Sequence, residues 1–435
     1  MADVQPLRGL RYTRDKIGDL AQVITPPFDV ISPEAQARYY ERHPYNVIRL
    51  ELGRQEPTDD TLNNVYTRAA ATLAEWRLQG ILHLEALPCY YVYQQRFTYA
   101  GQTFARTSLF ARIRLEPWSA RVILPHEHIR TKDKDERLKL LHACATNLSP
   151  IMGIYEDVQG QIRHLLSSYA DTPEVQIVDE LGEEHRVHPI TDPDVMTLIH
   201  NFFALRQLYI ADGHHRYTTA LQYRDEVHQQ RRELHPLDGA NFVLMALIER
   251  DDPGWLVLPT HRVLFDLSAD QLHTVSQSQL AQYFTVQALD AQEANEQVLT
   301  TLHQAGQDSP SLVLKTQGQT LLLSINQRGR ERMARSGHSA AWNELDVAIV
   351  QTLILEELLG LSLEDIAAGR YIRYSHDIQE AWRSLQCQDA QAILLLNGIP
   401  LRQVCEVAQA DDRMPQKSTY LYPKLATGLV MNLLS

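Results

Sequence analysis

The chain has 435 residues, of which 44% are hydrophobic and 22% are charged, and its formal net charge is −13 at pH 7. This length predicts two or three compact units rather than one small core. The acidic balance argues against a general nucleic-acid binder, which needs a basic face to displace counterions.

The cysteines and the N-terminus favour a cytoplasmic protein. The four cysteines are scattered and form no C-x-x-C pair, so neither a disulfide framework nor a zinc ribbon is expected, and reduced thiols fit the cytoplasm. The N-terminal residues carry charges where a signal peptide needs an apolar stretch. No apolar run approaches the roughly 20 residues that span a membrane. We therefore expect a small-molecule substrate, with neither nucleic acid nor membrane as partner.

The first segment, residues 1–157, is expected to form an N-terminal α/β region. It begins with a Pro-rich stretch around Asp29, which is extended because each proline constrains the residue before it. Asp29 in this restrained loop is a candidate base or cation ligand, but a turn carboxylate that bonds the local backbone is an equal alternative. Further on, the pattern predicts a helix over 58–79 and a hairpin of two strands, 89–99 and 102–114.

A polar stretch near the end of this segment, PHEHIRTKDKDER, combines possible metal ligands with cations. In an extended chain His126 and His128 project the same way and could hold a transition metal, although no third protein ligand is evident nearby. Glu127 points the opposite way and is a candidate base. Lys132 and Arg137 could reach an anionic substrate. A solvated loop that leads into a charged helix explains the stretch equally well.

The second segment, residues 158–266, alternates strands and helices and contains the strongest motif, LYIADGHHRY. The apolar strand 208–211 ends in Asp212-Gly213, and a helix begins at once. Such a junction exposes unpaired backbone N–H groups, and the helix dipole adds positive potential. Gly213 lets an anion approach the backbone closely. The pattern predicts an anion-binding site.

The side chains of this motif strengthen the prediction. His214, His215 and Arg216 add donors, and arginine can hold a phosphate with two parallel hydrogen bonds. Asp212 could orient a histidine or hold a divalent cation. The structural alternative is an ordinary helix start with exposed basic residues.

The remaining residues are expected to form an inserted small α/β subdomain, 267–340, and a C-terminal region that completes the core, 341–435. Just before the insertion, His261 in a His-Arg pair suits phosphate contact, although a strand edge explains it as well. The tail MPQKSTYLYPK contains Lys417, which could fold over an active site or act only as a surface clamp. An apolar helix predicted at 346–359 would serve either a core or a homodimer interface.

Three common motifs are missing from the sequence. It contains no G-x-x-x-x-G-K-[ST] P-loop, no G-x-G-x-x-G fingerprint and no G-x-S-x-G elbow. The common nucleotide-binding and hydrolase folds are therefore not supported.

Six groups of motifs span nearly the whole chain: ITPPFDVIS, HPYNVIRLELG, HEHIRTKDKDERLKLL with ATNLSPIMGIYED, YIADGHHRYTTAL, DDPGWLVLPTHR and MPQKSTYLYPKLATGLVM. In these motifs the chain resembles the bacterial and archaeal family catalogued as domain of unknown function 1015.

The DGHHR stretch is also similar to the phosphate loop of free-serine kinases, which share a fold with sulfiredoxin and the ParB partition nucleotidases. This likeness implies a mixed α/β fold with a ParB/sulfiredoxin-like core, in which Gly213, His214, His215 and Arg216 bind the donor's phosphates. Sulfiredoxins have a cysteine at the position of His214, so sulfinic-acid reduction is not expected. The helix-turn-helix and basic surface of ParB proteins are not visible either.

Motif and resemblance together predict a Mg²⁺-dependent phosphotransferase. It would move a phosphoryl group from a nucleotide (ADP or ATP) or pyrophosphate to the hydroxyl of a small metabolite, with free L-serine as the first candidate. Asp29, Glu127, Asp212 and His215 are the candidate catalytic residues, with Asp212 as the possible Mg²⁺ ligand. The alternatives are a phosphatase of small phosphomonoesters such as phosphoserine, a ParB-like nucleotide-binding switch, and a metal hydrolase built on His126, His128 and Asp212.

Overall fold

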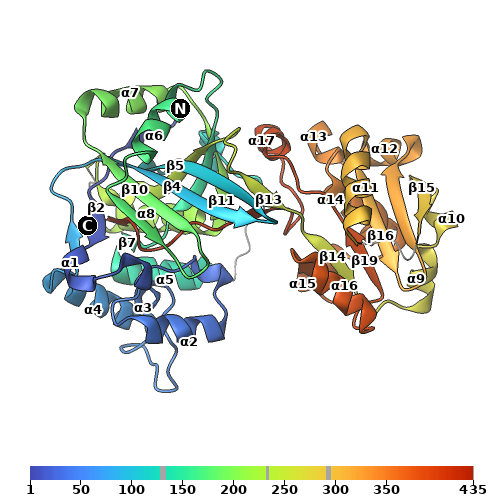
Figure 1. The fold of residues 1–435 in the computed structure, drawn as a ribbon, viewed down its shortest axis with the longest axis horizontal. Coiled ribbons are helices and arrows are strands. Elements are labelled where there is room, and N and C mark those ends of the chain that lie inside the picture. Colours follow the sequence, from blue (N-terminus) through green and yellow to red (C-terminus); the bar gives the residue numbers. More distant parts are fainter. Residues whose placement is uncertain (128–133, 232–234, 291–294, 435) are drawn as a thin grey trace. The chain divides into compact units, whose positions relative to one another are not determined.

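The computed structural model describes residues 1–127, 134–231, 235–290 and 295–434, and these divide into two compact units. Unit 1 contains the described residues of 1–125, 134–255 and 423–434, and unit 2 contains those of 126–127 and 256–422. Both units mix helices and strands (Figure 1), which confirms the expected mixed α/β class.

The centre of unit 1 is one large sheet. Its strands follow the order β6-β11-β8-β12-β5-β4-β10-β9, and β1 pairs with β5. β11 runs parallel to β6 and antiparallel to β8. The central strand β12 reads FVLMALIE and is buried at every position, because both faces of the sheet are covered. The strands are β1 (Val4–Gln5), β4 (Tyr90–Tyr99), β5 (Gln102–Arg114), β6 (Ile123–Leu124), β8 (Ile151–Tyr155), β9 (Val175–Val178), β10 (Glu184–Ile190), β11 (Leu208–Asp212) and β12 (Phe242–Glu249).

Helices pack on this sheet from both sides. In the view of Figure 1, α6 (Gln161–Ala170) and α7 (Pro193–Phe203) lie above the sheet, and α5 (Lys134–Cys144) lies below it. The first turns of α8 (His214–Gln230) share a core with the strands through Tyr217. Farther along, α8 packs on α5 through buried apolar side chains. Both α5 and the start of α8 are thus fixed against the same sheet.

A small sheet in unit 1 contains strands from near both ends of the chain. Its strand order is β3-β2-β21-β7, with β2 (Gly9–Tyr12), β3 (Leu82–Leu84), β7 (Thr146–Asn147) and β21 (Met431–Leu433). Because β21 pairs with β2 and β7, the last residues of the chain are held in unit 1.

The N-terminal helices only partly follow the sequence prediction. They are α1 (Arg14–Ile17), α2 (Pro33–Arg42), α3 (Ile48–Glu51) and α4 (Val65–Leu78). Ser32 caps α2, since its hydroxyl accepts a hydrogen bond from the Ala35 N–H. The start predicted for the next helix, residue 58, is wrong. That helix begins at Val65, because Asn64 caps it by accepting from two backbone N–H groups of the first turn.

Unit 2 is built on an antiparallel sheet with the strand order β15-β17-β16-β19-β14-β18. Alternate residues of its strands enter two different cores: Leu312 and Leu314 face one, and Val313 faces the other. The apolar helix predicted at 346–359 is present as α14 (Asp346–Ile349) followed by the π-helix η5 (Val350–Leu358), and it is buried in the first core. The strands of unit 2 are β13 (Leu256–Leu258), β14 (His261–Leu264), β15 (Phe284–Leu289), β16 (Ser311–Thr316), β17 (Thr320–Ile325), β18 (Ile372–Ser375), β19 (Ala392–Leu395) and β20 (Tyr420–Tyr422).

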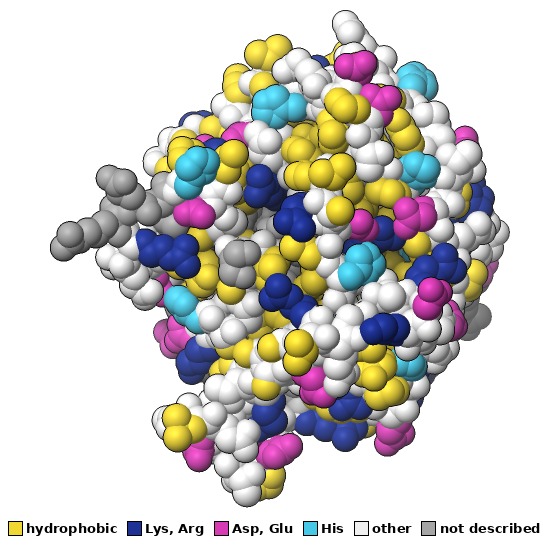
Figure 2. Space-filling view, turned by 90° about the vertical axis from the view of Figure 1, so that its left-hand side faces the viewer, with side chains coloured by type: hydrophobic (Ala, Val, Ile, Leu, Met, Phe, Trp, Pro, Cys, Tyr) yellow, Lys and Arg dark blue, Asp and Glu magenta, His cyan; other side chains and the backbone are white. Residues whose placement is uncertain are grey.

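The expected boundary between residues 340 and 341 falls inside unit 2, since 256–422 fold together. No described helix is both long and apolar enough to cross a membrane. On the face drawn in Figure 2, Lys and Arg side chains are interleaved with acidic, histidine and hydrophobic ones. The remaining helical elements are η1 (Leu20–Gln22), η2 (Phe28–Val30), η3 (Trp118–Ala120), η4 (Gly239–Asn241), α9 (Ala269–Thr274), α10 (Gln277–Leu280), α11 (Asn295–Asp308), α12 (Gln327–Met333), α13 (Ala340–Asn343), α15 (Leu363–Ala368), α16 (Ile378–Gln386) and α17 (Leu401–Gln409).

Candidate functional site

The strand-turn-helix junction forms as the sequence predicts. β11 ends at Asp212, and α8 begins at His214 with Gly213 as its N-cap at φ 95° and ψ 28°. This left-handed conformation favours glycine. A Cβ atom at position 213 would also lie 3.0 Å from Nε of Arg216, which folds back over the turn. The first N–H groups of any helix lack intrahelical acceptors, and Gly213 carries no side chain that could cap those of α8.

Two cations bind Asp212 at this junction. Lys424 Nζ lies 2.8 Å from Oδ1, and Arg216 Nη2 lies 2.8 Å from Oδ2. Burial alone would raise the pKa of Asp212, but the charges of Lys424 and Arg216 outweigh it and hold the pKa well below its usual value. The carboxylate is therefore ionised and fixes both cations beside the start of α8.

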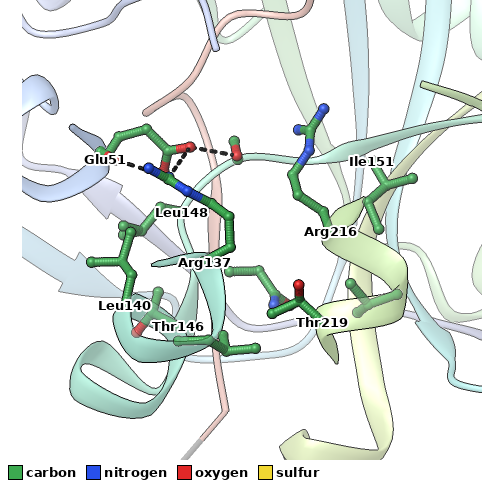
Figure 3. A pocket seen from close by; sticks show the side chains of 12 residues that line it. Glu51, Arg137, Leu140, Thr146, Leu148, Ile151, Arg216 and Thr219 are labelled. Carbon is green, nitrogen blue, oxygen red and sulfur yellow. Dashed lines mark hydrogen bonds and ion pairs between the residues drawn. The ribbon is translucent and has the colours of Figure 1, made fainter. Parts of the chain in front are cut away.

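Arg216 also borders a pocket of about 60 Å³ in unit 1. Its Nη1 donates to the Pro150 carbonyl at 2.5 Å. A pocket of this size has room for a few water molecules or a small anion. In Figure 3 the Arg216 side chain extends from α8 on one side of the pocket, while those of Glu51 and Arg137 point toward each other on the other side.

Arg137, which the sequence suggested as an anion contact, lines the same pocket. Its Nη1 lies 3.6 Å from Glu51 Oε1 and donates to the Glu51 carbonyl at 3.0 Å. The same Oε1 accepts a hydrogen bond from Ser149 Oγ at 3.0 Å. The Arg137 guanidinium also covers the Phe28 ring, at 3.7 Å from its centroid. Glu51 is only 3% exposed, so Arg137 and Ser149 supply the partners that a buried carboxylate requires.

Three buried side-chain atoms of α8 have no hydrogen-bond partner among the described residues. They are His215 Nδ1 and the hydroxyl oxygens of Thr218 and Thr219. Thr219 lines the pocket directly. Unsatisfied buried polar atoms are rare in native proteins unless a ligand or water completes them. His214 is also buried.

The remaining candidates are spread over both units. Asp29 lies in η2 of unit 1, is exposed, and has no hydrogen bond or ion pair with the described residues. Glu127 belongs to unit 2, where it forms a bridge with Met414. Lys417 is also in unit 2, exposed and at φ 57°. Lys132 and His128 lie outside the described residues.

His261 is an interior residue of unit 2. It begins β14, is 2% exposed, and its Nδ1 accepts a hydrogen bond from the Leu396 N–H at 3.3 Å. Burial, with smaller contributions from the charges of Arg262 and His376, lowers the pKa of His261 to about 4. A neutral, buried imidazole that accepts a backbone bond fits the strand-edge alternative better than phosphate contact.

Two residues of the site, Glu51 and Lys424, were not selected from the sequence. Both lie in stretches that carry the family resemblance, HPYNVIRLELG and MPQKSTYLYPKLATGLVM. A carboxylate in an otherwise apolar stretch is the signal that could have found Glu51, because such a group needs a partner when buried. The tail contains two lysines, Lys417 and Lys424. Only the structure shows that Lys424 is the one that contacts Asp212.

Comparison with solved structures finds distant likenesses. A free serine kinase in complex with AMP is 10% identical, with a TM-score of 0.36 over 72% of this chain and 86% of that chain. A conserved hypothetical protein from Pyrococcus furiosus is 10% identical, with a TM-score of 0.35 over 73% and 92%. C-terminally truncated SbnI from Staphylococcus aureus is 11% identical, with a TM-score of 0.36 over 74% and 86%.

No curated protein matches the sequence. A family model described as "Protein of unknown function (DUF1015)" matches residues 4–348, most of the chain. This match confirms the resemblance seen in the sequence, and the chain belongs to that family.

Proposed function

We propose that the start of α8 binds the phosphates of a nucleotide or of pyrophosphate, and that the protein transfers a phosphoryl group to the hydroxyl of a small metabolite. The observation that carries the proposal is the pair of cations, Arg216 and Lys424, which Asp212 holds at a helix start that has no side-chain cap. Two cations against one carboxylate, together with the helix dipole, leave a positive site for an anion.

In the proposed reaction, backbone N–H groups from His214 to Arg216 cradle the transferred phosphate. The P–O bond to the donor breaks, and its electron pair leaves with the donor oxygen. The acceptor oxygen forms the new P–O bond, and its proton passes to a carboxylate. Asp29 and Glu127 stay candidates for that base. The structure adds Glu51, because it lines the same pocket as Arg216.

Asp212 does not fit the expected role of Mg²⁺ ligand in this arrangement. Each of its two carboxylate oxygens is already bonded to a cation, Lys424 on one and Arg216 on the other. We therefore propose Asp212 as the residue that positions these two cations. We still propose that Mg²⁺ neutralises charge on the donor's phosphates. We assign no residue of the chain as its ligand.

The finer parts of the proposal come from the DGHHR resemblance. They are a ParB/sulfiredoxin-like core around 158–266, free L-serine as the first acceptor, and ADP, ATP or pyrophosphate as donor. A cytoplasmic enzyme, acting alone or as a homodimer, is the setting we propose.

Phosphorus NMR tests the proposal directly. The purified protein is incubated with Mg²⁺ and L-serine, and with ADP, ATP or pyrophosphate in parallel. We expect a phosphoserine signal that depends on one donor. Arg216→Ala should lower its rate by about 100-fold or more, the usual cost of losing a preorganised donor to a transferred group. Arg231→Ala changes an exposed arginine just after α8 and should keep the wild-type rate.

Two outcomes would contradict the kinase reaction. A wild-type rate in Arg216→Ala would remove the assigned site. Release of inorganic phosphate from phosphoserine without any donor would instead establish the phosphatase, with water as the acceptor.

A further inference from the structure

A second cluster of chemically active side chains lies in unit 1, at the hairpin between β9 and β10. Asp179, Glu183 and His185 come from the sequence DELGEEH, and one potential ligand atom of each lies within 4.8 Å of the other two. Glu183 and His185 are buried. None of these residues contributes to the site at α8 described above.

His185 is the key residue of this cluster, because its ring is almost fully buried and its Nε2 faces the carboxylate of Asp179. It is 1% exposed. Its Nδ1 lies 2.8 Å from the Tyr93 hydroxyl. Its Nε2 lies 3.2 Å from Asp179 Oδ2, at ion-pair distance, and makes no well-aligned hydrogen bond with a described residue. A buried ring nitrogen without a hydrogen bond needs another partner.

The two carboxylates are held in place by other atoms and leave oxygens for such a partner. Asp179 Oδ1 accepts from the N–H groups of Leu181 and Glu183, each at 2.9 Å, so Oδ2 stays on the side of His185. Glu183 Oε2 accepts from Gln95 Nε2 at 2.7 Å. Oε1 of Glu183 has no hydrogen bond among the described residues.

The positive charge of the buried Arg106 acts on Glu183 in this cluster. Arg106 also donates to Gln95 Oε1 at 2.6 Å. Asp179 and Glu183 together bring two carboxylates to this cluster. A divalent cation between the three side chains would offset this charge.

We propose that Asp179 Oδ2, a Glu183 carboxylate oxygen and His185 Nε2 bind a divalent transition-metal ion, Zn²⁺ or Mn²⁺. Imidazole nitrogen suits Zn²⁺ and carboxylate oxygen suits Mn²⁺, and three protein ligands leave a position for water. Tyr93 and Gln95 provide the outer contacts. If His185 Nδ1–H donates to the Tyr93 hydroxyl, Nε2 keeps its lone pair for the metal.

The proposed ion has a structural role that the contacts define. Gln95 Nε2 donates to Glu183 and also to the Lys424 carbonyl, at 3.0 Å. One amide group thus links the metal cluster to the chain segment that carries Lys424. Fixing Glu183 by a metal would hold the β9–β10 hairpin and this segment together. This inference does not depend on the proposed phosphoryl transfer.

The test is a titration of the full chain, first stripped with a chelator, with Zn²⁺ and separately with Mn²⁺ in a calorimeter. We expect about one tight ion per chain and a higher melting temperature in its presence, because a ligand that binds only the folded state stabilises it. His185→Gln should weaken this binding by at least about 10-fold. His188→Gln, three residues along the same strand β10 and bonded only to a backbone carbonyl, should bind as the wild type does.

Two results would overturn the proposal. The first is the absence of a saturable ion in the wild-type chain. The second is equal affinity in wild type and His185→Gln, which would assign the ion to other histidines. Should His185→Gln fail to fold, Glu183→Gln serves the same purpose. Its amide oxygen can still accept from Gln95 while the charge needed for the metal is lost.

Discussion

At the residue scale, Gly213 makes the sharpest prediction. Alanine at this position would have to adopt φ 95° and would push against the Arg216 guanidinium. We expect Gly213→Ala to destabilise unit 1 by about 1–3 kcal/mol and to weaken inorganic phosphate binding, since Arg216 must move. Chemical denaturation and phosphate titration measure the two effects.

Gly101 offers the matched control. It has φ 78°, but nothing lies within 4 Å of a Cβ placed there. Gly101→Ala should therefore show the backbone cost alone and keep phosphate affinity. Equal phosphate affinities in the two variants would contradict the role assigned to Arg216.

Asp212 makes a prediction about pH. Its pKa in the folded chain is depressed by Lys424 and Arg216, so its contribution to stability is complete above the unfolded value of about 3.9 and is lost as pH falls below it. Asp212→Asn should cost about 3 kcal/mol at neutral pH, because two cations lose their partner. In denaturation curves from pH 7 to pH 2, the difference from wild type should stay constant down to about pH 4 and shrink below it. A difference that stays constant over the whole range would contradict the ion-pair account.

Sequence patterns found one half of this site and missed the other for a physical reason. Asp212, Gly213 and Arg216 are neighbours along the chain, so local rules about helix starts identify them. Lys424 and Glu51 reach the site only through tertiary packing: Lys424 follows Asp212 by 212 residues in sequence. No local period encodes such a pairing.

At the element scale, the late start of α4 shows how local side-chain bonds compete with a helix. The residues before it, PTDDTLNN, contain a plausible cap and acidic first-turn residues. Here the Asp60 carboxylate instead accepts from the N–H groups of Leu62 and Asn63, both at 2.7 Å. These bonds hold a turn, and Asn64 then starts the helix. The ends of strands β4 and β5 were predicted within one residue. The turn residues between them and the strand pattern on either side both indicate the same hairpin.

At the scale of the whole molecule, the sequence segments and the two compact units differ because strand pairing is not local. The last segment, 341–435, looked like one region. Its final residues leave unit 2 and pair as β21 with strands from the beginning of the chain. The run of helices and strands from 256 to 422 meanwhile forms a six-stranded sheet, a two-stranded sheet and two cores of its own. Hydrophobic patterns predict each strand, but they do not indicate its partners.

Because each unit has its own core, we expect a separate unfolding transition for each unit. The pH dependence caused by Asp346 should identify the transition of unit 2. Burial raises the pKa of Asp346 to about 7, while its Oδ1 accepts from the Ser311 N–H at 3.2 Å. The folded chain thus binds a proton between about pH 4 and pH 7 that the unfolded chain releases, so stability falls as the pH rises through this window. Asp346→Asn keeps the acceptor oxygen without the ionisable group. In calorimetry this substitution should raise the stability of unit 2 by about 2 kcal/mol at pH 8 and flatten the pH dependence of that stability between pH 5 and pH 8. The unfolding transition of unit 1, which Asp212→Asn shifts, should not change. The control is Asp308→Asn, which changes an exposed aspartate of the same unit. If the stability of Asp346→Asn changed with pH as that of the wild type does, the Asp346 carboxyl would already be ionised in the folded chain.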